Sequence, residues 1–313
     1  MPNVLVRRRL RLPGGGGRGA VMWATGLVAA GAGAAEVASA LSVGAFATVG
    51  AETVGALRLV VAAIVLGVVF QPRLRRRPAE EWVAIIGFGI AMAGTSLALH
   101  AAIARVPLGI AVTIQFLGPC VVALAASRRL VEVLCAVMAL AGVVVIAGPG
   151  GAFDAAGFAL ALLAAAFLAL YTVLAEKVGK SAAATADLSL AVGVAALVAL
   201  PFVGGGMARM TPGALGLIAV SAVLGVVVPY SADTLAARLS SARVIGTLFS
   251  LDPVMGLAMG WLILRQAVSP LAVTGVLVVV CAGGLLVWSG GQASSRRVGR
   301  ATAGWPRIRR GAR

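Results

Sequence analysis

The sequence predicts an all-α membrane protein with ten transmembrane helices in two inverted five-helix repeats. Hydrophobic residues make up 61% of the 313 positions, well above the roughly 45–50% that is usual in soluble domains. They gather in long uninterrupted windows, each about as long as a helix must be to cross a bilayer. Two of these windows, around Pro119 and Pro253, also resemble each other.

Ten apolar windows, each bounded by charged residues or by Gly and Pro, account for the ten helices. Very short turns separate the first window from the second and the third from the fourth. The predicted spans cover residues 20–43, 50–70, 82–103, 107–126, 131–148, 155–175, 185–203, 213–236, 243–264 and 269–289.

The distribution of Lys and Arg orients these spans, because the cytoplasmic loops of membrane proteins are enriched in basic residues. With a cytoplasmic N-terminus, most of the 26 Lys and Arg fall on the inside, including those after Ser295. Both termini are therefore predicted to be cytoplasmic. The remaining basic residues are Arg105, Arg209 and Arg265 on the outside and Arg58 within a span. An acidic residue, Glu36, just before an Ala-Ser-Ala sequence favours an uncleaved first helix over a signal peptide.

The two similar windows indicate how the halves of the chain are related. Aligning Pro119 on Pro253 also superposes Thr113 on Thr247. One window is the fourth predicted span and the other the ninth, so they cross the membrane in opposite senses. Such inverted repeats are typical of secondary transporters, which bind substrate at the repeat interface. We therefore expect a basic cytoplasmic N-terminus at 1–19, a first repeat at 20–149, a second repeat at 150–289 and a disordered basic tail at 290–313.

Several function classes are not expected. The formal charge of +16 comes mainly from loops and termini, where basic residues set topology and contact anionic lipid, so no nucleic-acid partner is predicted. The cysteines Cys120, Cys135 and Cys281 lie in apolar windows without a CxxC pair, and there is one histidine. We therefore expect no metal site and no cofactor. No catalytic motif or catalytic residue is identified, so an enzyme is not predicted.

Charged residues inside a span are costly, and they usually mark a functional site. Glu36 in the first span and Arg58 in the second lie at similar depths, some 10–12 Å from the outer surface at roughly 1.5 Å rise per residue. They can therefore face each other. Two interpretations stay open: a structural ion pair across a hairpin, or a pair that binds the carboxylate and ammonium ends of a substrate.

The repeated windows carry different polar residues beside their prolines. Asp252 precedes Pro253, and Gln115 lies at the corresponding depth near Pro119. Each proline is predicted to break its helix and free a backbone carbonyl. A carboxylate in this position suits proton coupling, with a helix-packing hydrogen bond as the alternative. Gln115 can bind a substrate but cannot carry a proton.

Other polar residues have ordinary interpretations beside functional ones. Tyr230 and Asp233 share one face of the eighth span, and an interfacial anchor is the simpler role for Asp233. His100 near the outer end of the third span is either a packed histidine or part of the transport path. Tyr171 is predicted to be an interfacial belt residue. Gly256 and Gly260 form a GxxxG pair, for which close packing is favoured over dimerisation.

Several short runs of residues carry a resemblance to a known family. With these runs, residues 20 to 289 resemble the EamA-type threonine/homoserine exporters of the drug/metabolite transporter superfamily. The runs are Val106-Pro107-Leu108-Gly109-Ile110-Ala111-Val112, Gly118-Pro119, Ser127-Arg128-Arg129, Gly55-Ala56-Leu57-Arg58-Leu59, Val228-Pro229-Tyr230-Ser231, Gly246-Thr247-Leu248 and Asp252-Pro253.

The resemblance implies ten helices in two inverted repeats and proton-driven export of small amino acids from the bacterial cytoplasm. By position, Arg58 matches an arginine of the family's second helix, and Asp252 an acidic position that is usually Glu. The sequence departs from the family pattern at Gln115, where Glu is common, and at His100, where an aromatic residue is usual. It also departs at Leu168, where Trp is frequent, and at Arg265-Gln266, where Gly-Glu is usual.

We therefore expect a bacterial inner-membrane exporter of small amino acids or related metabolites that works by proton antiport with alternating access. Its partners would be a small-molecule substrate, protons and the lipid bilayer. The alternatives are export of amphipathic drugs or nucleosides, and a non-transporting membrane partner subunit. The residues expected to bind substrate are Arg58, Glu36, Gln115, Tyr230 and His100, and those expected to couple protons are Asp252 and Glu36.

Overall fold

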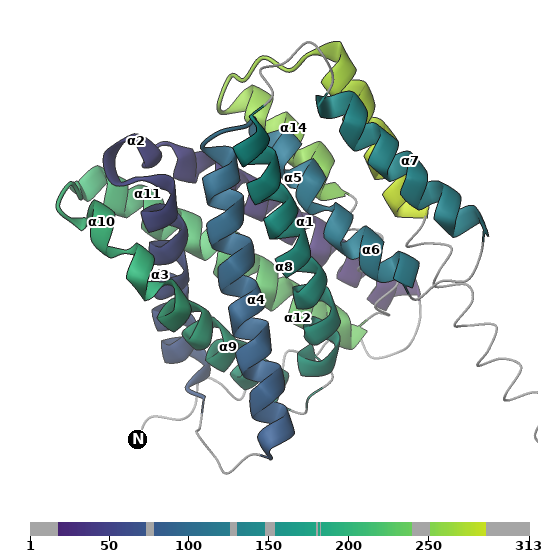
Figure 1. Cartoon of the computed structure of the whole chain (residues 1–313). Helices are drawn as coiled ribbons and strands as arrows, with labels where there is room; N and C mark the ends of the chain where they lie inside the picture. The colour runs from purple at the N-terminus through teal and green to yellow at the C-terminus, as the bar shows by residue number, and fades with distance from the viewer. Residues whose placement is uncertain are drawn as a thin grey trace, which may run out of the picture.

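A computed structural model describes residues 18–72, 78–125, 130–147, 154–179, 181, 183–239 and 251–285. Every regular element in these ranges is helical, which confirms the predicted all-α class. Figure 1 shows the helices as one bundle, with α7 and the yellow helix 270–285 side by side at one edge.

Six helical stretches are long and apolar enough to cross a membrane. This supports the prediction of a multi-pass membrane protein. Four of them are single helices, one is α9 with a 3-10 turn, and one joins α11, the π-helical η2 and α12. The bounds are α1 (Arg18–Val43), α3 (Ala51–Phe70), α4 (Ala79–Ile103), α8 (Ala155–Gly179), α9 (Ala184–Ala199), η1 (Leu200–Phe202), α11 (Pro212–Ala222), η2 (Val223–Val227) and α12 (Val228–Leu239).

The remaining predicted spans are represented by shorter helices. The fourth is divided into α5 (Leu108–Gln115) and α6 (Leu117–Ala125), the fifth is α7 (Leu130–Ala147), and the tenth is the helix Pro270–Leu285. The ninth is seen from Asp252 onward as α14 (Asp252–Leu262), and residues 240–250 lie outside the described ranges. Two short helices, α2 (Phe46–Val49) and α10 (Gly204–Met207), lie between longer ones. The count of ten spans and their inverted arrangement stay predictions.

The largest apolar core is formed by α3, α4, α8 and α9, with Leu59, Met92 and Val192 completely or almost completely buried. Large apolar side chains also cover the outside of the bundle. Leu130 is 82% exposed and Val144 70% exposed on α7. Exposed apolar side chains of this kind suit a lipid environment, where charged residues face the interior of the bundle.

The two proline-containing segments lie against each other. A side chain at Gly109 of α5 would run into the backbone of Leu257 of α14, so the two helices cross at very close range. Pro119 lies in the first turn of α6 and Pro253 in the first turn of α14. A proline is tolerated in a first turn because that turn lacks upstream carbonyl partners.

The π-helical segment η2 has a cause in the sequence. Pro229 has no backbone N–H, and its ring meets the carbonyl four residues earlier, which belongs to Gly225. The helix widens to i→i+5 spacing over Val223–Val227 before it continues as α12. Single π turns of this kind often occur at functional sites.

Candidate functional site

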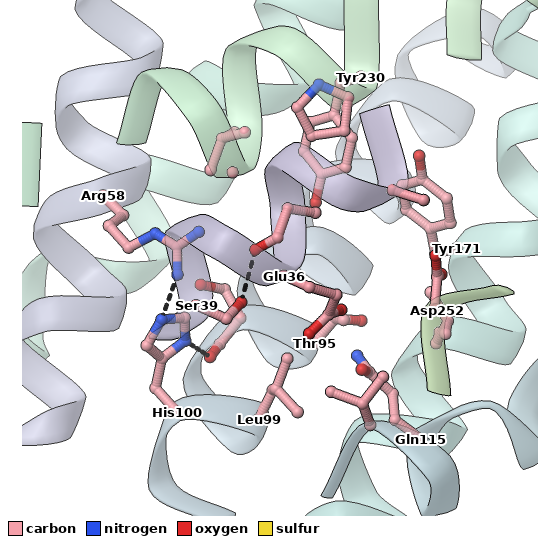
Figure 2. Close-up of a pocket in the computed structure, with 18 of the residues that line it drawn as sticks. Glu36, Ser39, Arg58, Thr95, Leu99, His100, Gln115, Tyr171, Tyr230 and Asp252 are labelled. Carbon is pink, nitrogen blue, oxygen red and sulfur yellow. Dashed lines mark hydrogen bonds between the residues drawn. The ribbon is translucent and has the colours of Figure 1, made fainter. Parts of the chain in front are cut away.

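The described residues enclose a cavity of about 150 Å³ between helices from both halves of the chain. Its walls come from α1, α3, α4, α5 and α6 of the first half and from α8, η2, α12 and α14 of the second. Figure 2 shows Arg58 and His100 on one side of the cavity, Asp252 and Tyr171 on the other, and Glu36 and Thr95 between them in this view. The walls include seven of the predicted residues: Glu36, Arg58, His100, Gln115, Pro119, Tyr230 and Asp252.

Arg58 is held by His100 rather than by a carboxylate. The arginine is 3% exposed, and its Nη1 hydrogen-bonds to His100 Nε2. On the other side of the ring, His100 Nδ1 lies 2.7 Å from the backbone carbonyl oxygen of Ser96. A carbonyl can only accept, so Nδ1 carries the proton and donates, and Nε2 presents its lone pair to the guanidinium. These two contacts indicate that His100 is neutral. It orients Arg58 and leaves the positive charge of the arginine in place (Figure 2).

Gly225 provides the space for the rest of the guanidinium. A β-carbon at this position would collide with Nη2 of Arg58 and lie 2.8 Å from Cβ of Ala38. Only the absence of a side chain lets the guanidinium approach the backbone of the π-helical segment. Arg58 Nε has no hydrogen-bond partner among the described residues. The guanidinium is thus fixed in place and still able to bind an anionic group.

Within the described residues, Glu36 lies near Arg58 and Asp252 but forms no direct hydrogen bond or ion pair with either of them. Its carboxylate interacts electrostatically with Arg58 and with Asp252, yet its Oε2 atom is buried and has no hydrogen-bond partner there. Gly256 leaves room for this oxygen, since a β-carbon would lie 3.2 Å from it. The direct ion pair with Arg58, one of the two predicted alternatives, is not formed in this geometry.

Asp252 and Gln115 bring the two proline-containing segments to the same cavity. Asp252 is the first residue of α14, and its Oδ1 atom is buried without a hydrogen-bond partner in the described part of the chain. Gln115 is the last residue of α5 and is 7% exposed. The cavity wall therefore contains an ionisable group from one segment and a neutral amide from the other.

Two interfacial assignments are wrong. Tyr171 is 7% exposed, and its ring packs 4.8 Å from Phe88 and 5.7 Å from Tyr230 between centroids. Asp233 also lines the cavity, one turn beyond Tyr230. An interfacial anchor would face the headgroups, whereas both of these side chains face the protein interior.

The two glycines of the GxxxG pair pack inside the protein, Gly256 against α1 and α5 and Gly260 against Gln266 and Leu108.

Two contributors to the site are not identified from the sequence. Thr95 lines the cavity with a buried hydroxyl that has no partner among the described residues. Gly225 is one of 41 glycines, and only the packing shows that it faces Arg58. The four-residue spacing between Gly225 and Pro229 is a usable signal, because it marks the carbonyl that the proline ring displaces.

These features define a class of protein. Several membrane-spanning helices surround a small cavity whose wall contains charged side chains, and this arrangement is typical of a multi-pass membrane transporter. Residues 155–288 match the model of the EamA-like transporter family.

Two curated relatives extend this likeness to most of the chain. The threonine/homoserine exporter RhtA of Escherichia coli (strain K12) is 31% identical over 246 residues, which cover 76% of this chain and 82% of the relative. The protein of the same name from Salmonella typhimurium (strain LT2) is 32% identical over 244 residues, with the same coverage. The chain therefore belongs to the EamA-like transporter family.

A solved structure supports the fold. It is titled only as the crystal structure of a protein and is 19% identical in sequence. The superposition covers 86% of this chain and 97% of the solved one, with a TM-score of 0.58. Together, the relatives and the apolar helices indicate a multi-pass inner-membrane protein.

Proposed function

We propose that the protein exports small amino acids, of the threonine and homoserine type, or closely related metabolites from the bacterial cytoplasm. One observation carries this proposal: a small buried cavity combines a fixed guanidinium with two carboxylates, Glu36 and Asp252, that each keep one oxygen without a hydrogen-bond partner among the described residues. An amino acid brings one carboxylate and one ammonium. Its carboxylate would bind Arg58, and its ammonium would bind between Glu36 and Asp252.

Cavity size favours a small substrate over an amphipathic drug. Pockets for drug-sized ligands usually measure roughly 300–1,000 Å³, whereas this cavity measures about 150 Å³. The names of the curated relatives, threonine/homoserine exporters, point in the same direction.

Proton antiport would drive the export. Asp252 is the coupling group in this mechanism, because its carboxylate is buried beside the substrate position and Oδ1 has no hydrogen-bond partner in the described residues. Protonation from outside would neutralise Asp252 and weaken its attraction for the ammonium, which releases the substrate. Deprotonation on the cytoplasmic side would restore the binding site. Ten spans with both termini in the cytoplasm provide the inverted repeats that such alternating access uses.

Transport assays in proteoliposomes test the proposal. Vesicles with the purified protein are loaded with unlabelled threonine or homoserine, and uptake of the labelled amino acid by counterflow is measured. We expect accumulation that requires the protein, with a larger panel of amino acids ranking the substrates. Protein that moves no small amino acid and co-purifies with another chain would favour the partner-subunit alternative.

A further inference from the structure

Buried polar atoms without a partner concentrate around the cavity. Five such side-chain atoms are found among the described residues, and four of them belong to cavity-lining residues. Three of the four are on the charged residues Glu36, Arg58 and Asp252. The fourth is Oγ1 of Thr95, a neutral residue of α4 that is 8% exposed.

The hydroxyl of Thr95 differs from most other helical hydroxyls in this protein. Serine and threonine in an apolar helix usually donate to the carbonyl three or four residues earlier. Thr113 donates to the carbonyl of Gly109 at 2.6 Å, Thr172 to Leu168 at 2.7 Å and Ser39 to Ala35 at 2.9 Å. Thr95 makes no such bond. Ser189 on α9 shares this property but does not line the cavity.

A buried hydroxyl without a hydrogen-bond partner is destabilising. A ligand that occupies the cavity would satisfy the Thr95 hydroxyl. The ligand chemistry follows from the neighbours. A carboxylate is attracted to Arg58 and an ammonium to Glu36 and Asp252, so an uncharged polar group is the part of the substrate left for Thr95.

Figure 2 places Thr95 between the Arg58 side and the Asp252 side of the cavity, above Leu99. A substrate held at both charged ends directs its side chain into this middle region. We propose that Thr95 is a specificity-determining residue that hydrogen-bonds the side-chain hydroxyl of the substrate. The inference rests on the proposed function and adds to it the residue that distinguishes a hydroxyl from a methyl group.

The test uses two isosteric pairs. Threonine and valine differ by a hydroxyl against a methyl group, and the substitution T95V makes the same exchange in the protein. Counterflow rates at several substrate concentrations give kcat/KM for each amino acid with wild-type protein, T95V and T95S. The matched control is T113V, whose hydroxyl is buried and bonded within its own helix.

We expect wild-type protein to prefer threonine over valine. T95V should lower this preference about fivefold, the effect of one neutral hydrogen bond, by loss of threonine transport. T95S and T113V should keep it. Wild-type protein that favours threonine together with an unchanged preference in T95V would overturn this inference and leave the proposed function intact. Wild-type protein that transports neither amino acid would overturn both.

Discussion

The Arg58 side of the cavity and the Asp252 side are built in different ways. Arg58 is fixed by a hydrogen bond to neutral His100 and by the close approach of Gly225. Asp252 stands at the first position of α14 with Oδ1 unbonded within the described residues. One side holds a permanent charge in a set position, and the other holds a titratable group with one oxygen that has no hydrogen-bond partner among the described residues.

The difference in construction suits one side to substrate binding and the other to proton coupling, as proposed above. A guanidinium stays protonated throughout a transport cycle, so it suits recognition of a carboxylate that must bind in every conformation. A carboxylate in an apolar setting can gain and lose its proton within the cycle. Substitutions on the two sides should therefore affect different measured quantities, and five predictions follow in order of expected effect.

The largest effect is expected for D252N on the coupling side. An amide cannot carry the proton, so export driven by a proton gradient should be abolished. Counterflow of the same amino acid, which needs no net proton movement, should remain. The measurement is uptake into proteoliposomes with and without an imposed gradient, and D252E, which keeps a titratable carboxylate at this position, serves as the control. Unchanged gradient-driven transport in D252N would remove Asp252 from the mechanism.

On the binding side, R58K should raise KM for threonine roughly tenfold or more. Lysine keeps the charge but loses the planar fork that can bind His100 and a carboxylate together. Coupling to protons should be retained at saturating substrate. The concentration dependence of counterflow gives this value, and a change in proton coupling without a change in KM would reverse the assignment of the two sides.

His100 should act through the position of Arg58. We expect H100F to raise KM about fivefold, because phenylalanine packs well but offers no acceptor to the guanidinium. H100Q should keep most of the affinity, since its amide oxygen can accept in place of Nε2. Equal effects of the two substitutions would indicate a packing role alone.

A smaller effect is expected for G225A. The added methyl group meets Arg58 Nη2 and must displace the guanidinium, which should raise KM a few-fold and leave the level of folded protein near that of wild type. G216A is the matched control, because Gly216 of α11 has open space around its added β-carbon. The concentration dependence of counterflow gives KM for both variants. An unaltered KM in G225A would show that the space at Gly225 is not required to position Arg58.

The smallest effect concerns the N-terminal end of α8, outside the residues that line the cavity. Asp154 accepts hydrogen bonds from the backbone N–H groups of Gly157 at 3.1 Å and Ala156 at 2.9 Å, and it pairs with Arg105 at 3.4 Å. The N–H of Gly157, followed by the other contacts, lowers the pKa of this carboxyl below its ordinary value. The stability that it contributes is therefore present above the ordinary pKa near 3.9 and is lost as the pH falls through the lowered value.

Thermal unfolding in detergent measures this contribution. D154A should lower the midpoint slightly at pH 7, and the difference from wild type should vanish at strongly acidic pH. D154N should lie between D154A and wild type at pH 7, because asparagine keeps the acceptor for the helix N–H groups but loses the charge that pairs with Arg105. A midpoint difference for D154A that persists in acid would indicate another cause.

The sequence was sufficient to predict most of the charged residues in the cavity wall but not how they are arranged. Charges within apolar windows identified Glu36, Arg58 and Asp252, because a buried charge stands out against so apolar a background. Tyr171 and Asp233 were placed at the interface because distance along a helix does not reveal which face turns inward. Thr95 has no recognisable signal in the sequence, and Gly225 has only its four-residue spacing to Pro229, since the roles of both depend on contacts between helices that are distant in the sequence.

The central claim is that proton movement through the cavity drives the export of a small amino acid. Its most direct test is a measurement of protons. Proteoliposomes that contain a pH-sensitive dye are given an outward gradient of threonine at equal pH on both sides. The account predicts that the interior acidifies as threonine leaves, in wild-type protein but not in D252N. Threonine efflux in wild-type protein without any change of internal pH would contradict it.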